Sequence, residues 1–124
     1  MKMSLVKHVV PGAYPGAFDG VQETSHEEYG RGIRWIFRID QGDHAGSLVS
    51  RTTKDEASVN NACGKFWKMI SGLSLEDAIT HDTDEWIGDG GMIVVEDSPS
   101  GEGVRVAQFI RDPKQARAVG DSTF

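Results

Sequence analysis

The stretch from residue 32 to residue 53 constrains the fold of this chain more than any other segment. Apolar side chains alternate there with mostly charged ones, so that Ile33, Trp35, Phe37 and Ile39 share one side and Arg34, Ile36, Arg38 and Asp40 the other. A period of two is typical of a β-strand with one face in a core. A glycine-containing turn covers residues 40–46, and β-prone residues 47–53 follow it. The pattern predicts an antiparallel hairpin that buries Trp35 and Phe37.

Three more segments have the composition of short strands, at residues 13–21, 92–96 and 104–110. Gly16 and Gly20 inside the first of them predict a bulge or sharp coiling, as a small barrel requires. Tyr14 and Phe18 on the same strand are predicted to be core residues. Polar residues 22–32 are expected to form a loop, and residues 97–103 a turn.

One principal helix is predicted between residues 59 and 70. Its apolar positions recur at helical spacing, at Val59, Ala62, Cys63, Phe66, Met69 and Ile70. Gly72 is placed to end this helix, and the sequence from Ser74 to Asp77 is a capping box for a short second one. Trp67 lies beside the apolar stripe, and packing is its favoured role.

Three strands, a helix and two strands make up the element order of an OB-fold, a five-stranded Greek-key barrel with its helix between strands three and four. The sequence therefore predicts a mainly β protein with one principal helix and an OB-fold-like barrel, with other small barrels as the alternative. The expected domain spans residues 12–112, between an N-terminal arm of residues 1–11 and a flexible tail of residues 113–124.

The net charge of −6 is unevenly distributed along the chain. Residues 31–68 carry seven basic and four acidic groups, whereas residues 69–112 carry two basic and ten acidic ones. Such asymmetry predicts one face that attracts a polyanion and another that repels it. The alternative is a solvated surface of mixed charge.

Several classes of protein fit the sequence poorly. No apolar run approaches the roughly 18 residues of a membrane-spanning helix, and the apolar segment near the N-terminus is too short for a signal peptide. A single cysteine, Cys63, rules out an internal disulfide and fits a reducing compartment. A cytoplasmic location is expected, and no membrane partner.

No catalytic or metal-binding signature stands out, so neither an enzyme nor a cofactor is expected. The four histidines are scattered, at His8, His26, His44 and His81. The acidic segment of residues 81–85 lacks the glycine and the ligand spacing of a calcium loop, and a solvated loop is its favoured interpretation.

Several segments together resemble a family of small phage-encoded proteins, many of which have no assigned function. The resemblance rests on Gly12-Ala-Tyr14, the strand of residues 33–40, the turn Gly42-Asp-His-Ala-Gly46, Asn60-Asn61, and Trp86-Ile-Gly88 before residues 92–95. It spans roughly residues 12–110. That family is thought to consist of OB-fold single-stranded DNA-binding proteins of phage replication and recombination modules. The resemblance implies that the chain binds single-stranded DNA. It also implies replication or recombination proteins as partners and the host cytoplasm as the location.

The binding surface of an OB-fold is the face of strands two and three, flanked by the loop between strands one and two. Cationic groups along such a face, with an aromatic ring for stacking, suit sequence-tolerant single-strand binding. The candidate nucleic-acid-binding residues are Tyr29, Arg31, Arg34, Ile36, Arg38, Arg51 and Lys54. The alternative is that Arg34 and Arg38 pair with acids on a neighbouring strand.

The ending Gly120-Asp-Ser-Thr-Phe124 resembles the acidic, phenylalanine-tipped tails of bacterial and phage single-stranded DNA-binding proteins. The resemblance implies Phe124 as a partner-binding residue, and a frayed end without function is the alternative.

The function predicted from the sequence is non-enzymatic binding of single-stranded nucleic acid, DNA in the first place and RNA as an open alternative. The second hypothesis, of another class, is a small β-barrel for protein–protein assembly, such as a phage structural or accessory subunit. A hydrolytic enzyme is third. Homo-oligomerisation stays open.

Overall fold

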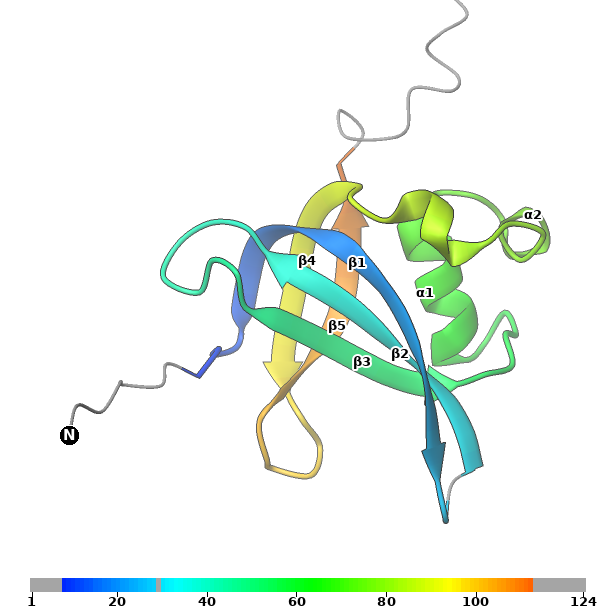
Figure 1. The fold of residues 1–124 in the computed structure, drawn as a ribbon, viewed down its shortest axis with the longest axis horizontal. Coiled ribbons are helices and arrows are strands. Elements are labelled where there is room, and N and C mark those ends of the chain that lie inside the picture. Colours follow the sequence, from blue (N-terminus) through cyan, green and yellow to red (C-terminus); the bar gives the residue numbers. More distant parts are fainter. Residues whose placement is uncertain (1–7, 29, 113–124) are drawn as a thin grey trace, which may run out of the picture.

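A computed structural model describes residues 8–28 and 30–112 (Figure 1). Its five strands form one antiparallel sheet in the order β3-β2-β1-β4-β5. The strands are β1 (Gly12–His26), β2 (Gly30–Ile39), β3 (Leu48–Lys54), β4 (Gly90–Asp97) and β5 (Val104–Arg111). The helix α1 (Ala62–Ser71), the short helix α2 (Leu75–Ala78) and the 3₁₀ helix η1 (Thr83–Trp86) all lie between β3 and β4. A mainly β fold with one principal helix is thereby confirmed.

The sheet curls strongly, so that its two edge strands approach each other (Figure 1). Arg51 of β3 donates a side-chain hydrogen bond to the backbone carbonyl of Val106 on β5 at 3.0 Å. The strand pairing of the described residues includes no ladder between β3 and β5, so the sheet is not a closed barrel. Helix α1 covers the end of the curled sheet where β3 and β5 come together (Figure 1).

The core lies inside the curl and is rich in aromatic rings. Trp35 and Phe37 of β2 are both fully buried, which confirms the predicted orientation of this strand. Phe37 contacts the rings of Phe18, Phe66 and Phe109, with centroids 5.1–6.1 Å apart. Such pairs stabilise a core beyond the burial of their area.

The indole of Trp35 is also satisfied as a hydrogen-bond donor. Its Nε1–H donates to the hydroxyl of Thr53 on β3 at 2.9 Å. Trp67, half-buried, packs edge-on against both Trp35 and Trp86. The favoured packing role of Trp67 is confirmed.

The bulge predicted in β1 lies between Phe18 and Gly20. Phe18 pairs with Phe37 and Gly20 with Ile36, so Asp19 is the additional residue. Gly20 has a φ of 115°, which a residue with a side chain rarely adopts. The bulge changes the parity of β1, so that Phe18 before it and Val21 after it both pack against the core.

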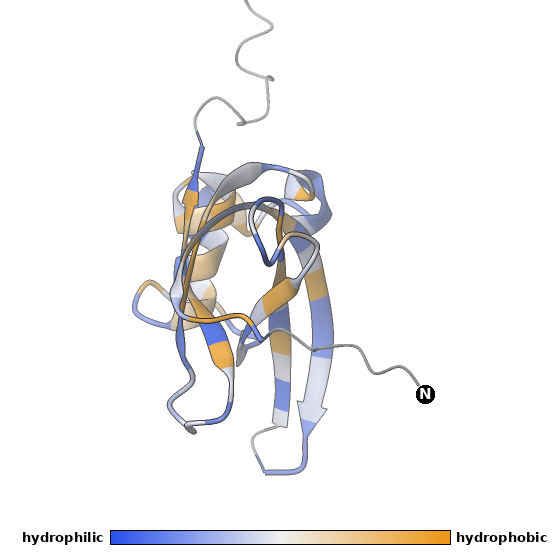
Figure 2. Cartoon of the chain, turned by 90° about the vertical axis from the view of Figure 1, so that its left-hand side faces the viewer, coloured by the Kyte–Doolittle hydropathy of each residue, from blue (hydrophilic) through white to orange (hydrophobic). Residues whose placement is uncertain are grey.

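The expectation of a loop over residues 22–32 is wrong. β1 continues to His26 and β2 begins at Gly30, with unbroken pairing from Gln22 opposite Arg34 to His26 opposite Gly30. Residues 22–32 form the part of the hairpin that extends beyond the core, and most of them are exposed. Their sequence therefore lacks the alternation of apolar and polar residues by which a half-buried strand is predicted. In Figure 2 the end of this hairpin is neutral to hydrophilic, whereas hydrophobic bands alternate along the strands above it.

The principal helix begins three residues later than its apolar pattern predicts. The side chain of Asn61 accepts from the backbone N–H of Gly64 and caps the helix, and Val59 stays outside it and exposed. Gly72 ends the helix in the left-handed conformation, as predicted. Tyr29, the arm of residues 1–7 and the tail of residues 113–124 with Phe124 lie outside the described residues.

The described helices are all short. None of them has the length and apolar character that crossing a membrane requires.

Candidate nucleic-acid interface

The side of β1, β2 and β3 that points away from the core forms the candidate interface, here called the outer face. On β2 it presents Arg34, Ile36 and Arg38, because these alternate with the buried Trp35 and Phe37. The neighbouring strands complete three cross-strand rows on this face: Gln22–Arg34–Thr52, Gly20–Ile36–Ser50 and Ala17–Arg38–Leu48.

No carboxylate of the described residues compensates the charge of Arg34 on this face. Its side chain is exposed, and its Nη1 lies 3.4 Å from the amide oxygen of Gln22. No carboxylate oxygen of another described residue lies within 4.0 Å of its guanidinium nitrogens. A neutral amide leaves the guanidinium free to attract an anion.

Arg38, although it lies on the same face, is neutralised. Its Nε is 2.8 Å from a carboxylate oxygen of Asp40, and its Nη1 is 3.2 Å from one of Asp19. The hydrogen bond to Asp40, together with the charge of that carboxylate, raises the pKa of Arg38. Pairing with acids, the alternative considered for both arginines, therefore describes Arg38 and not Arg34.

A groove of about 660 Å³ runs along the distal part of the hairpin and the end of β3. Three of the predicted cations, Arg31, Arg34 and Lys54, line it together. We call it the cationic groove; its other lining residues are Thr24, Ser25, His26, Gly30, Gly32, Thr52 and Thr53. The side-chain hydroxyls of Thr24, Ser25 and Thr52 add donors for anionic oxygens.

The cations of the groove are only weakly engaged within the protein. Arg31 is 3.7 Å from Asp55, with most of its side chain in solvent, so this ion pair contributes little. Lys54 is exposed and forms no ion pair with a described residue. Gly32, opposite Lys54, has no room for a side chain: a Cβ there would lie 2.7 Å from the carbonyl oxygen of Thr53.

Ile36 lies between the two arginines and is half-buried, and Leu48, opposite Arg38, is 59% exposed. These two apolar side chains flank the polar groups of the outer face. Among the described residues of this face there is no phenylalanine, tyrosine or tryptophan. Tyr29, the aromatic residue predicted for the site, lies outside the described residues.

Arg51 does not join the other predicted residues. It shares the inward side of β3 with Val49 and Thr53, and its guanidinium carbon lies 5.9 Å from the ring centre of Phe66. Burial, and secondarily the nearby charge of Arg105, lowers the pKa of Arg51. Its contacts make it a structural residue between the two edge strands, and the alternation Val49-x-Arg51-x-Thr53 could have predicted this position.

The uneven charge of the sequence maps onto different elements. The basic segment of residues 31–68 forms most of β2, with β3 and α1, and the acidic segment of residues 69–112 forms α2, η1, β4 and β5. Most cations of the described strands therefore lie on β2 and β3, while β5 carries the other two, Arg105 and Arg111.

Residues 81–85 are mostly exposed, as expected of a solvated segment, but they form the start of η1 rather than a loop. Asp82 and Glu85 form a capping box at the start of η1, and Nδ1 of His81 lies 3.1 Å from Glu85. Within residues 8–28 and 30–112 no group of three or more histidine, cysteine or acidic side chains could hold a metal ion.

Comparisons of this chain with protein-family models, with curated proteins and with solved structures find no match.

Proposed function

We propose that this protein binds single-stranded nucleic acid, DNA in the first place, on the outer face of β1, β2 and β3, without catalysing a reaction. The observation that carries the proposal is the cationic groove, in which Arg31, Arg34 and Lys54 lie together with little internal charge compensation. We further propose that the fold is an OB-fold-like Greek-key barrel. Pairing of β1 with both β2 and β4, and the approach of β3 to β5, support that assignment.

Binding begins with the backbone of the strand. Arg34 and Lys54 are diagonal neighbours on β2 and β3, because Arg34 pairs with Thr52, two residues before Lys54. Diagonal neighbours are separated by about 7–8 Å, which suits two phosphates of an extended single strand. The hydroxyl groups of the groove donate to further phosphate oxygens.

Bases then contact the apolar part of the outer face. Ile36 and Leu48 offer apolar surface beyond the groove, and the guanidinium plane of Arg34 offers a stacking surface. None of these contacts reads the hydrogen-bonding edge of a base, so we expect binding to tolerate different sequences. Partner proteins of a phage-type replication or recombination module, and a cytoplasmic location, belong to the same proposal.

Protein–protein assembly is the second candidate function. Met92 of β4 and Ile110 of β5 pair directly on the side of the sheet that faces away from the core. They are 37% and 51% exposed, and exposed apolar patches mark interaction surfaces. A protein that uses only this surface would not bind oligonucleotides.

Fluorescence anisotropy with labelled oligo-dT, measured at a low and a higher salt concentration, tests the proposal. Counterion release from single strands gives a log–log slope of about −0.7 per phosphate contact, so three cations predict a slope of about −2. We expect weaker binding of a duplex of the same sequence. Absence of oligo-dT binding at low salt would favour the assembly function, and comparison of oligo-dT with oligo-rU separates DNA from RNA binding.

A further inference from the structure

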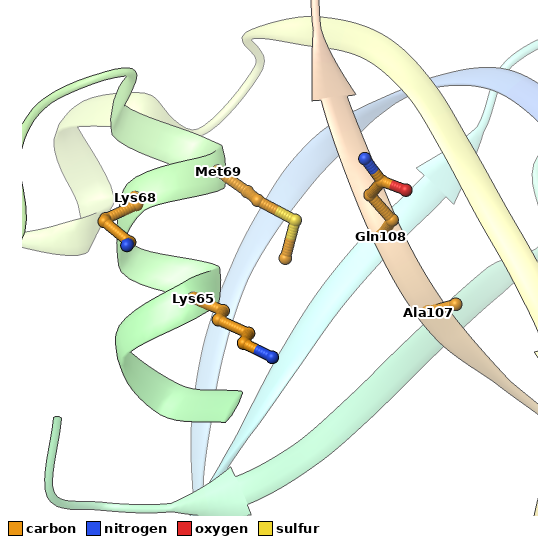
Figure 3. A pocket seen from close by; sticks show the side chains of 5 residues that line it. All are labelled: Lys65, Lys68, Met69, Ala107 and Gln108. Atoms are coloured by element: carbon orange, nitrogen blue, oxygen red, sulfur yellow. The ribbon is translucent and has the colours of Figure 1, made fainter. Parts of the chain in front are cut away.

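A second groove, of about 410 Å³, lies between α1 and β5 (Figure 3). Lys65, Lys68 and Met69 of α1 line one side, and Ala107 and Gln108 of β5 line the other. We call it the helix groove. It shares no lining residue with the cationic groove.

The helix groove combines an apolar floor with two positive charges. Met69 points from α1 toward β5 (Figure 3), and Ala107 is a small apolar residue of the lining on β5. Lys65 and Lys68 are one helical turn apart and exposed, and neither forms an ion pair with another described residue. The groove therefore offers complementarity to a ligand with apolar groups and negative charges.

A buried backbone donor next to the lining residue Gln108 is paired with a weak acceptor, the sulfur of another lining residue. β5 is an edge strand, and the N–H of Phe109 is directed to the sulfur of Met69 on α1, at 3.4 Å. A thioether accepts hydrogen bonds weakly, and the methionine side chain has three rotatable bonds. A peptide carbonyl in the groove would satisfy this N–H better, once Met69 rotates away.

We propose that the helix groove binds an extended acidic peptide segment of a partner protein. A carbonyl of the peptide accepts from Phe109 N–H at the edge of β5, in the manner of strand addition. Its carboxylates pair with Lys65 and Lys68, and its apolar side chains cover Met69 and Ala107. This site is separate from the surface proposed for nucleic acid and does not depend on it.

The lining favours a peptide over a nucleic acid. None of the five lining residues has an aromatic ring or a guanidinium group, which supply base stacking in single-strand sites. Edge-strand backbone donors and apolar floors are instead features of peptide recognition.

The test uses a fluorescein-labelled peptide that alternates glutamate and leucine, with a peptide that alternates glutamine and leucine as the uncharged control probe. We expect the acidic peptide to bind the wild-type protein, and Lys65→Gln/Lys68→Gln to weaken it about tenfold. Arg34→Ala is the matched control, because it removes a cation outside the groove and should leave peptide affinity unchanged. In amide NMR spectra the Phe109 resonance should shift when the acidic peptide is added.

Three results would overturn the proposal. The first is no binding of the acidic peptide at millimolar concentration, or equal binding of the glutamine control. The second is unchanged affinity of Lys65→Gln/Lys68→Gln, with a native spectrum that shows it to be folded. The third is a double variant that no longer binds oligo-dT, together with competition between oligo-dT and the acidic peptide for the wild-type protein. That result would make the helix groove part of a nucleic-acid surface.

Discussion

The guanidinium of Arg51 joins the two edge strands of the sheet, because it donates to the backbone carbonyl of Val106 at 3.0 Å. The two residues are 55 positions apart in sequence. No backbone ladder links β3 and β5 among the described residues, so this side chain supplies a contact that strand pairing would supply in a closed barrel. The ring of Phe66 beneath the guanidinium adds a cation–π contact.

Replacement of Arg51 by methionine is expected to lower the free energy of unfolding by about 1–3 kcal/mol, because the Val106 carbonyl loses its partner in a half-buried place. Affinity for oligo-dT should not change, since Arg51 points away from the outer face. Urea denaturation of Arg51→Met, beside Arg34→Met as a variant of an exposed arginine, measures the difference. Equal stability of the two variants would contradict the structural role of Arg51.

Phe37→Ala is expected to cost about 3–5 kcal/mol of stability. The ring is fully buried and contacts three other aromatic rings, so truncation leaves a cavity in the middle of the core. Leu48→Ala is the control, because Leu48 is a large apolar residue on the next strand that is mostly exposed. If thermal unfolding shows the two variants to be equally stable, the orientation of β2 is wrong.

Gly16→Ala tests the close approach of β1 to β2. A Cβ at this position would lie 2.2 Å from the carbonyl oxygen of Arg38 and 2.5 Å from the side chain of Ile93, so backbone must move. We expect a loss of about 1–3 kcal/mol. At Gly12 of the same strand a Cβ would come no nearer than 3.4 Å to the Tyr14 side chain, so Gly12→Ala should be tolerated. Similar melting temperatures for the two variants would refute the packing described for Gly16.

Cys63 should be unreactive in the native protein. The thiol is buried on α1, and this burial raises its pKa, so less of the reactive thiolate is present at a given pH than for an exposed cysteine. We expect alkylation by iodoacetamide near neutral pH to be far slower in buffer than in urea. Since Cys63 is the single cysteine of the chain, mass spectrometry follows it without interference. Comparable rates under both conditions would contradict its burial.

The elements that could be predicted from the sequence are those whose periodicity reports a buried face. β2 is one example, since Trp35 and Phe37 alternate with charged residues and are buried as predicted. The distal part of the hairpin has no such signal, because backbone pairing alone extends it past the core. The helix η1 has no apolar periodicity either, although Asp82 and Glu85 have the spacing of a capping box.

The sequence predicts which strand face carries the candidate site, but it does not predict which of the arginines on that face are paired with carboxylates. Alternation along β2 places Arg34 and Arg38 on one side, and the structure agrees. Whether each arginine is paired depends on residues far away in the sequence: Asp19, the additional residue of the β1 bulge, lies near Arg38, and Gln22 is the neighbour of Arg34. Such cross-strand neighbours follow from register, which local patterns do not contain.

The contrast between Arg34 and Arg38 gives the most direct test of nucleic-acid binding. Both arginines lie on the outer face, but among the described residues carboxylates pair with Arg38 and not with Arg34. The decisive measurement is the salt dependence of oligo-dT affinity for the wild type, Arg34→Ala and Arg38→Ala. We predict that Arg34→Ala weakens binding and makes the log–log slope shallower by about 0.7, as loss of one phosphate contact requires. Arg38→Ala should keep the wild-type slope. If Arg34→Ala binds with the wild-type affinity and slope, the outer face is not the nucleic-acid interface.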